Sequence, residues 1–124
     1  MVRKLTTGLC PYRWGKFEKR TNIGALNVLD YLLEFKISNV AEVLYTQNGQ
    51  INNEEEAYKK IGEYLSIDGN TVMSLVYDLL EEMDPEMGVL SSFGMTVDYL
   101  RNQTNAKIEE MHASLNKSEE SSDW

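Results

Sequence analysis

The stretch NEEEAYKKIGEYLSIDGNTVMSLVYDLLEEM, residues 53–83, decides the fold. It begins with an asparagine, whose side chain can cap a helix, and three glutamates follow that suit the positive end of a helix dipole. Apolar residues then recur at helical spacing on both sides of SIDGN, residues 66–70, which has the composition of a turn. We therefore predict two helices joined by a tight turn.

Helical patterns also precede this pair. A broad apolar pattern begins at Thr21–Asn22 and runs to Phe35, which predicts a central helix over this range. A short break is expected at residues 36–38. A second, shorter helix should follow and end at Asn48–Gly49, because both residues tolerate positive φ.

The pattern weakens after the pair. Asp84–Pro85 is expected to restart the chain, since Asp can cap a helix and Pro suits the first helical position. Residues 85–116 suit one or two helices, with weak points at Gly88 and Gly94. The run RNQTN, residues 101–105, is polar all round, so a helix there needs packing against a partner.

The fold class that follows is all-α, because no strand alternation is sustained. We predict a single helical domain of about five helices over residues 21–115. Residues 1–20 form a basic, aromatic N-terminal arm before it. Residues 116–124, NKSEESSDW, have the composition of a flexible, disordered acidic tail.

The charge is divided between the arm and the rest of the chain. Residues 1–20 hold six basic and one acidic side chain, while the other 104 residues hold six basic and 19 acidic ones. Gly8, Pro11 and Gly15 punctuate the arm, so a long helix is not expected there. A short strand, a loop and a flexible arm all remain open.

Composition excludes several classes of protein. The longest apolar stretches fall far short of the ~20 residues that span a bilayer, and no secretory signal is recognisable at the N-terminus. Cys10 is the single cysteine, which rules out an internal disulfide and fits a reducing cytoplasm. A net charge of −8 argues against nucleic acid as the main partner and favours basic or apolar partners.

No catalytic or metal-binding constellation is visible. The carboxylate pairs lie at expected helix starts or on polar faces, whereas catalysis needs a pair held in a pocket. His112 stands beside Glu109 and Glu110 without the spacing that carboxylate metal sites use. There is no glycine-rich phosphate loop. We expect no catalytic residue, no metal and no cofactor, and the chain is not expected to be an enzyme.

Two groups of residues have the chemistry of interfaces. The arm combines cations with aromatic rings, which supply contact area and directional pairing. Methionine, which adapts to irregular partners, is frequent. The candidates for self-association or partner binding are Arg13, Trp14, Phe17, Arg20, Met73, Met83 and Met87. The alternatives are that Trp14 and Phe17 fold back onto their own domain and that the methionines fill the core.

Residues 61–76, IGEYLSIDGNTVMSLV, resemble a helix-turn-helix of the winged-helix regulators in the spacing of their apolar residues. Two features argue against DNA. Gly62 replaces the usual alanine of the first helix. The second helix is expected to expose Met73, Tyr77 and Asp78 and carries no Lys or Arg to meet phosphate or guanine. We interpret the segment as a helical hairpin of the core.

The overall plan is similar to the small tail assembly chaperones of long-tailed bacteriophages. The matching features are a short N-terminal segment with glycine and aromatic residues, then the leucine-rich TNIGALNVLDYL, residues 21–32. An acidic helix pair over residues 53–83 and a polar C-terminus at residues 116–124 complete the likeness.

This resemblance implies a role in binding. Members of the family coat the apolar, helical tape measure protein before the tail tube forms, tend to self-associate into rings or open spirals, and are absent from the finished virion. It implies action in the cytoplasm of the infected host cell, with no membrane partner. Docking of the basic arm on the acidic body of a neighbouring copy would be heterologous, which gives rings or spirals.

Two other functions stay open. One is a helix-turn-helix DNA-binding regulator. The other is a small acidic inhibitor or adaptor that mimics nucleic acid on a basic host protein, for which the acidic residues should form one continuous face.

Overall fold

The computed structural model describes residues 5–121, with side chains over residues 5–113. Over the described residues the chain forms six α-helices and two short 3-10 helices, with no strand, so the predicted all-α class is confirmed. The chain divides into two compact units, Met1–Gly94 and Met95–Trp124. The predicted arm belongs to the first unit.

Helix α1, Pro11–Thr21, lies within the predicted arm, where a long helix was not expected. Proline suits the first turn of a helix, where its missing N–H costs nothing. Trp14 and Phe17 point inward, with only 5% and 0% of their surfaces exposed. Their burial outweighs the low helix propensity of Gly15, so the prediction of a non-helical arm was wrong because tertiary packing overrides a local signal.

The predicted central helix starting at Thr21–Asn22 is also wrong. Asn22 ends α1 instead, with a left-handed φ of 58° and its N–H bonded to the Glu18 carbonyl. A 3-10 turn, Ala25–Asn27, and a five-residue helix α2, Val28–Leu32, follow. Asn is favoured both before the first residue of a helix and after the last one. The sequence alone therefore took Asn22 as the start of a helix, whereas it ends one.

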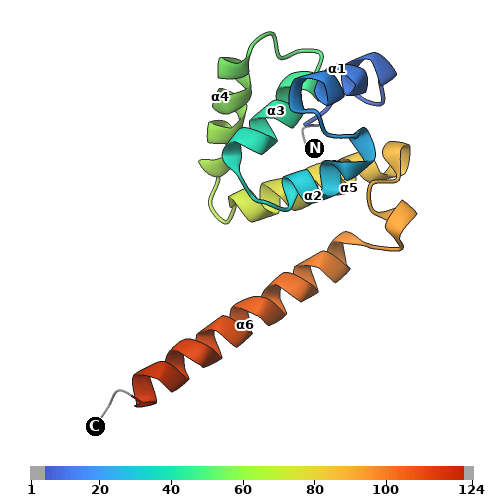
Figure 1. Cartoon of the computed structure of the whole chain (residues 1–124). Coiled ribbons are helices and arrows are strands. Elements are labelled where there is room, and N and C mark those ends of the chain that lie inside the picture. The colour runs from blue at the N-terminus through green and yellow to red at the C-terminus, as the bar shows by residue number, and fades with distance from the viewer. Residues whose placement is uncertain (1–4, 122–124) are drawn as a thin grey trace. The chain divides into compact units, whose positions relative to one another are not determined.

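Helix α4, Glu54–Leu65, agrees with the predicted range. Helix α3, Ile37–Gln47, ends where predicted but begins inside the break that was expected at residues 36–38. Asn53 caps α4 by accepting a hydrogen bond from the Glu56 N–H at 2.9 Å. Helix α3 packs against both α1 and α4, so it is the central helix of the first unit (Figure 1). Its buried residues include Val40, Val43 and Leu44.

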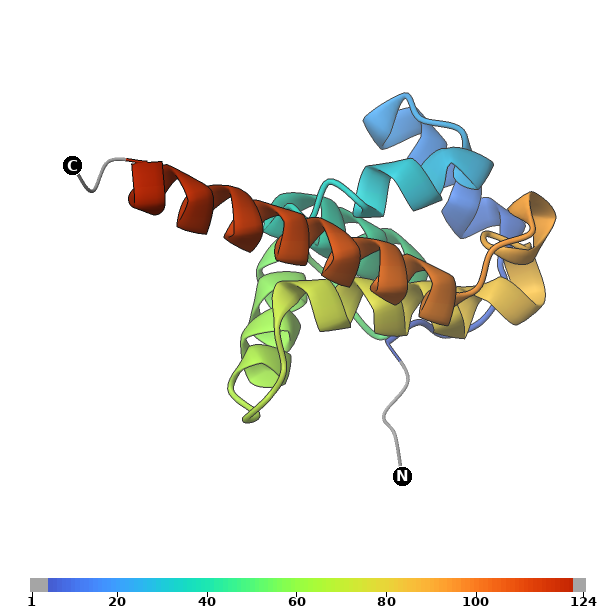
Figure 2. The ribbon, with the colours of Figure 1, turned by 90° about the horizontal axis from the view of Figure 1, so that it is seen from below.

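Helix α5, Val72–Met87, begins where predicted but continues past Pro85. Thr71 and Ser74 form a reciprocal capping box at its start. The turn that joins α4 to α5 lies at the end of the pair away from α1 (Figure 2). The predicted restart at Asp84–Pro85 was wrong, because proline falls in the last turn and disrupts only one backbone hydrogen bond there.

The side chain of Asp84 closes the loop after α5. It accepts hydrogen bonds from the backbone N–H groups of Leu90 and Ser91 at 2.9 and 2.8 Å. These bonds, that from Ser91 foremost, hold the pKa of Asp84 below its ordinary value. Gly88 and Gly94, the predicted weak points, end α5 and the short 3-10 helix Ser91–Phe93 with positive φ.

The residues before α1 are tied into the first unit by side-chain hydrogen bonds. The Glu82 carboxylate of α5 accepts from the backbone N–H groups of Leu5 and Thr6 at 2.9 and 2.7 Å, and from the Thr6 hydroxyl at 2.7 Å. The Asn48 amide donates to the Leu5 carbonyl at 3.0 Å. Leu5 and Thr6 are consequently buried.

The second unit consists of α6, Val97–Ser121, preceded by residues 95–96. Over residues 85–116, where one or two helices were predicted, the structure has the last residues of α5, the 3-10 helix Ser91–Phe93 and most of α6. Of the tail predicted at 116–124, residues 116–121 continue the α6 backbone, and residues 122–124 lie outside the described part of the chain.

Candidate partner-binding pocket

A shallow pocket in the first unit brings three of the sequence-predicted binding residues together. Trp14 of α1 meets Met83 and Met87 of α5 there. The full lining is Thr6, Gly8, Leu9, Trp14, Gln47, Met83, Glu86 and Met87. The hollow measures about 220 Å³, but this volume counts open solvent, so the enclosed space is much smaller. It is therefore a shallow surface on which a partner can rest, and it does not enclose a side chain or a cofactor.

The secondary structure explains how these side chains converge. Met83 and Met87 are four residues apart, so they lie on one face of α5. Trp14 reaches them from the buried face of α1, where its ring also meets Phe17 edge-on at 5.5 Å. Gly8 turns the chain over the pocket with a φ of +97°, a conformation that other residues rarely adopt.

The pocket has an exposed leucine and a carboxylate at its rim and a buried amide among its lining residues. Leu9 is 49% exposed, and Glu86 adds a carboxylate near Gly8. The buried Gln47 amide donates from Nε2 to the Arg13 carbonyl at 3.1 Å and to the Thr46 hydroxyl at 3.0 Å. Its Oε1 is buried with no hydrogen-bond partner among the described residues. An N–H or O–H group of a bound partner that reached this oxygen would remove a cost of about 1–3 kcal/mol.

The other predicted arm residues do not line this pocket. Phe17 is fully buried and packs edge-on against Tyr31 of α2 at 5.4 Å. The backbone carbonyl of Arg13 accepts from Gln47, and its Nε is buried without a hydrogen-bond partner among the described residues. Trp14 and Phe17 thus contact their own domain, which is the alternative that the sequence left open.

Arg20 pairs with acidic residues of its own chain. Its guanidinium binds the carboxylates of Glu42 on α3 and Glu54 on α4, and it lies 4.8 Å from the ring centre of Tyr45. Hydrogen bonding to Glu42 is the main reason that the pKa of Arg20 is raised. The charge complementarity between arm and body is therefore used, in part, inside one molecule.

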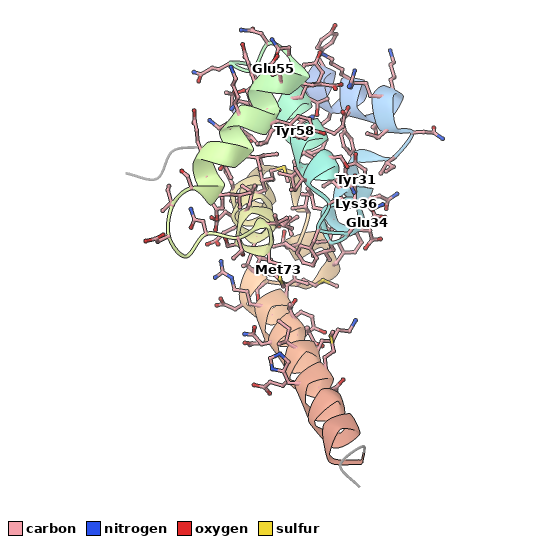
Figure 3. All side chains as sticks on the ribbon, turned by 90° about the vertical axis from the view of Figure 1, so that its left-hand side faces the viewer. Tyr31, Glu34, Lys36, Glu55, Tyr58 and Met73 are labelled. Carbon is pink, nitrogen blue, oxygen red and sulfur yellow. The ribbon has the colours of Figure 1, made fainter. Side chains whose placement is uncertain are left out.

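Met73 lies at the start of α5, ten residues before Met83, which is about 15 Å along a helix. It is drawn with Tyr31 of α2 and Tyr58 of α4 in Figure 3 and does not line the pocket. Tyr31 is half-buried, and burial, followed by the charges of Glu42 and Glu34, raises its pKa. Met73 and the pocket methionines therefore occupy separate places on α5.

Several residues of the helix pair α4–α5 that a recognition helix would expose are engaged within the chain. Tyr77, which was expected to be exposed, is buried and packs edge-on against Phe35 at 6.0 Å. Tyr64 of α4 donates to the Asp78 carboxylate at 2.7 Å and lies 2.9 Å from the Ser74 hydroxyl, which holds the two helices together. The polar side chains that a recognition helix would use are thus engaged within the pair.

Several acidic side chains bind groups of their own chain. Besides Glu82 and Asp84, the Glu18 carboxylate accepts from the Ala25 N–H at 2.8 Å, and that of Glu56 accepts from the Asn52 N–H at 2.8 Å. These acids are spread over α1, α4 and α5. They serve as hydrogen-bond acceptors for backbone groups of the same chain.

The described residues contain no candidate metal site and no helix that could cross a membrane. No group of three or more His, Cys, Asp or Glu side chains there is placed to hold a metal ion. None of the helices described has both the length and the apolar character to cross a bilayer.

Cys10 precedes α1, and hydrogen bonding from the Arg13 N–H lowers the pKa of its thiol.

The sequence did not predict five of the pocket residues: Thr6, Gly8, Leu9, Gln47 and Glu86. No sequence pattern indicated Gln47, because its burial depends on the packing of α1 against α3.

Comparison with known proteins found no relative of this chain. No protein-family model, no curated protein and no solved structure matches this chain.

Proposed function

We propose that this chain is a non-enzymatic tail assembly chaperone. It self-associates and coats an apolar, helical tape measure protein in the cytoplasm of an infected bacterial cell, before the tail tube forms, and it is absent from the mature virion. The proposal rests on the resemblance described above, which concerns the N-terminal segment, the leucine-rich stretch and the acidic helix pair.

The pocket is the structural observation that best supports this proposal. Trp14, Met83 and Met87 form apolar walls, and methionine side chains adapt to partners of varied shape. A shallow surface lined by apolar side chains suits a helix that presents apolar residues at intervals. Reversible binding is also expected, because one small apolar contact contributes little free energy by itself.

The structure changes how self-association should be understood. The arm of the proposed docking mechanism is largely helix α1, in which Trp14 and Phe17 are buried and Arg20 pairs with Glu42 and Glu54 of the same chain, whereas Tyr12 is exposed. Trp14, Phe17 and Arg20 are thus engaged within the chain, so they support a contact between copies less than the sequence suggested.

The test is co-expression with a tape measure protein and measurement of how much of that protein stays soluble. The unaltered chain should rescue its solubility. Leu9→Asp should reduce the rescue, because it places a charge at the mouth of the pocket. Leu26→Asp is the matched control, since Leu26 is 53% exposed and does not line the pocket. Failure of the unaltered chain to rescue, or equal rescue by both variants, would count against the proposal.

A further inference from the structure

Two hydrogen-bond acceptors at the pocket have no partner among the described residues. Gln47 lines the pocket and is 1% exposed, and its Oε1 receives no hydrogen bond. The carboxylate of Glu86, an exposed side chain of the lining, is likewise not engaged by another described residue. The Thr6 hydroxyl and the Gln47 amide nitrogen, which could donate, are already bound. A partner that rests on this surface should therefore bring a hydrogen-bond donor.

The C-terminal end of α5 adds negative potential at the same place. Met83, Glu86 and Met87 lie near this end of the helix, and no basic side chain occupies its last turn. Backbone carbonyl groups at the end of a helix carry a partial negative charge that favours a cation. Arg13 of α1 does not line the pocket, and its Nη1 lies 2.7 Å from the position that a Cβ on Gly49 would take. A positively charged donor from a partner thus fits the pocket better than a neutral one.

The apolar wall beside these acceptors suits a long hydrocarbon chain. Met87 is half-buried and lines the pocket together with the buried Trp14 and Met83. Arginine and lysine cover apolar surface with their stems and keep the charged end at a polar rim. The planar guanidinium of arginine carries five N–H donors and can meet two acceptors at once. Gln47 Oε1 is covered in the unbound chain, so contact with it requires a wall side chain to move, and methionine is a flexible one.

We propose that the pocket binds an arginine side chain of the partner helix. The stem lies over Met87, and the guanidinium donates to the Glu86 carboxylate and to Gln47 Oε1. Leu9, which is 49% exposed, contacts an apolar residue of the same helix one turn away. The inference rests on the proposed function, because it takes the occupant of the pocket to be a partner helix, and it names the side chain by which that helix is selected.

The test compares three helical peptides of leucine, alanine and glutamine that differ only at one central position. This position holds arginine in the first peptide, its uncharged isostere citrulline in the second, and norleucine in the third. A Trp124→Phe background leaves Trp14 as the only tryptophan, so its indole N–H signal in NMR reports binding at the pocket. The arginine peptide should bind about fivefold more tightly than either of the others.

Two variants show whether the preference comes from the pocket. Glu86→Gln should reduce the preference for arginine over citrulline to less than about twofold, because the guanidinium loses its charged acceptor. Glu81→Gln is the matched control: Glu81 is an exposed residue of the same helix that does not line the pocket, so the preference should remain. Circular dichroism checks that both variants keep their helix content.

Three results overturn the inference: equal binding of the peptides, tighter binding of the norleucine peptide, or no shift of the Trp14 signal at millimolar peptide. So does an equal loss of preference in the two variants, which would show a general attraction to an acidic protein. Solubility rescue of a tape measure protein tests the proposed function separately. Rescue without a preference for arginine leaves that function standing, whereas binding of the arginine peptide without rescue leaves only the peptide site.

Discussion

Glu82 is the residue that fastens the N-terminal segment to the first unit. Its carboxylate accepts three hydrogen bonds, two from backbone N–H groups and one from the Thr6 hydroxyl. Hydrogen bonds to a charged group contribute more than neutral ones, and buried donors that lose their acceptor are costly. The position thus has a structural importance that its place in the sequence, inside an acidic run, does not suggest.

Replacing Glu82 with alanine should lower the free energy of unfolding by about 2–3 kcal/mol, because Leu5 and Thr6 lose their acceptor. Urea denaturation followed by tryptophan fluorescence measures the change, since Trp14 is buried near this segment. Glu81→Ala is the matched control on the same helix. Glu81 is exposed, so its variant should stay within about 0.5 kcal/mol of the unaltered protein.

Asp84 gives stability that depends on pH. Its pKa in the folded protein is below the ordinary value, so its contribution is present above the pKa of the unfolded chain and is lost as pH falls through the lower, folded value. Asp84→Asn should therefore cost about 1 kcal/mol near pH 6, and the cost should shrink as the pH falls below the ordinary pKa of an aspartate. Unfolding curves of both proteins from pH 7 to pH 2 provide the measurement. A difference that stays constant over this range would show that the carboxylate charge is unimportant.

At the scale of elements, local signals predicted α4 and the start of α5 correctly. Asn53 and the acidic turn after it specify where α4 begins, because the cap and the dipole act within a few residues. The same kind of signal failed at Asn22, which suits either end of a helix, and at Pro85, which the last turn of α5 tolerates. Burial of Trp14 and Phe17 decided α1, and no local pattern contains that information.

The cap of α4 can be tested directly. Asn53→Ala should lower the free energy of unfolding by about 1 kcal/mol, because the Glu56 N–H loses its acceptor. Asn52→Ala is the control: its backbone N–H donates to Glu56 whatever the side chain, so its effect should be a few tenths of a kcal/mol. Equal effects of the two substitutions in thermal unfolding would mean that the cap is not what stabilises the start of the helix.

The pocket was predictable in part. The spacing of Met83 and Met87 on one helix face follows from the sequence alone, as does the choice of Trp14 as an interface residue. Their meeting does not follow, because it requires α1 to form and to pack beside α5. Gln47 and Thr6 join the pocket through contacts between residues about 40 and 76 positions apart.

At the scale of the whole molecule, the division at Gly94 separates a folded core from one long helix. The first unit holds its own buried core, whose largest fully buried side chains include Phe17, Leu32, Leu44, Leu79 and Leu80. The second unit is essentially one helix. The proposed function places the partner-binding pocket in the first unit.

A chain that stops after Gly94 should therefore keep its fold. Its thermal transition should remain cooperative, because the first unit holds its own buried core. Circular dichroism with rising temperature provides the measurement. A broad, gradual transition would show that the first unit needs residues after Gly94 to fold.

The bonds between Leu5, Thr6 and Glu82 have a consequence for biosynthesis. They join residues up to 77 positions apart, and a ribosome adds roughly 5–20 residues per second. The N-terminal segment therefore waits roughly 4–15 s for its acceptor to be made. Until then the nascent chain cannot complete its first unit, and a product truncated before Glu82 should be removed by the proteases that clear unfolded chains.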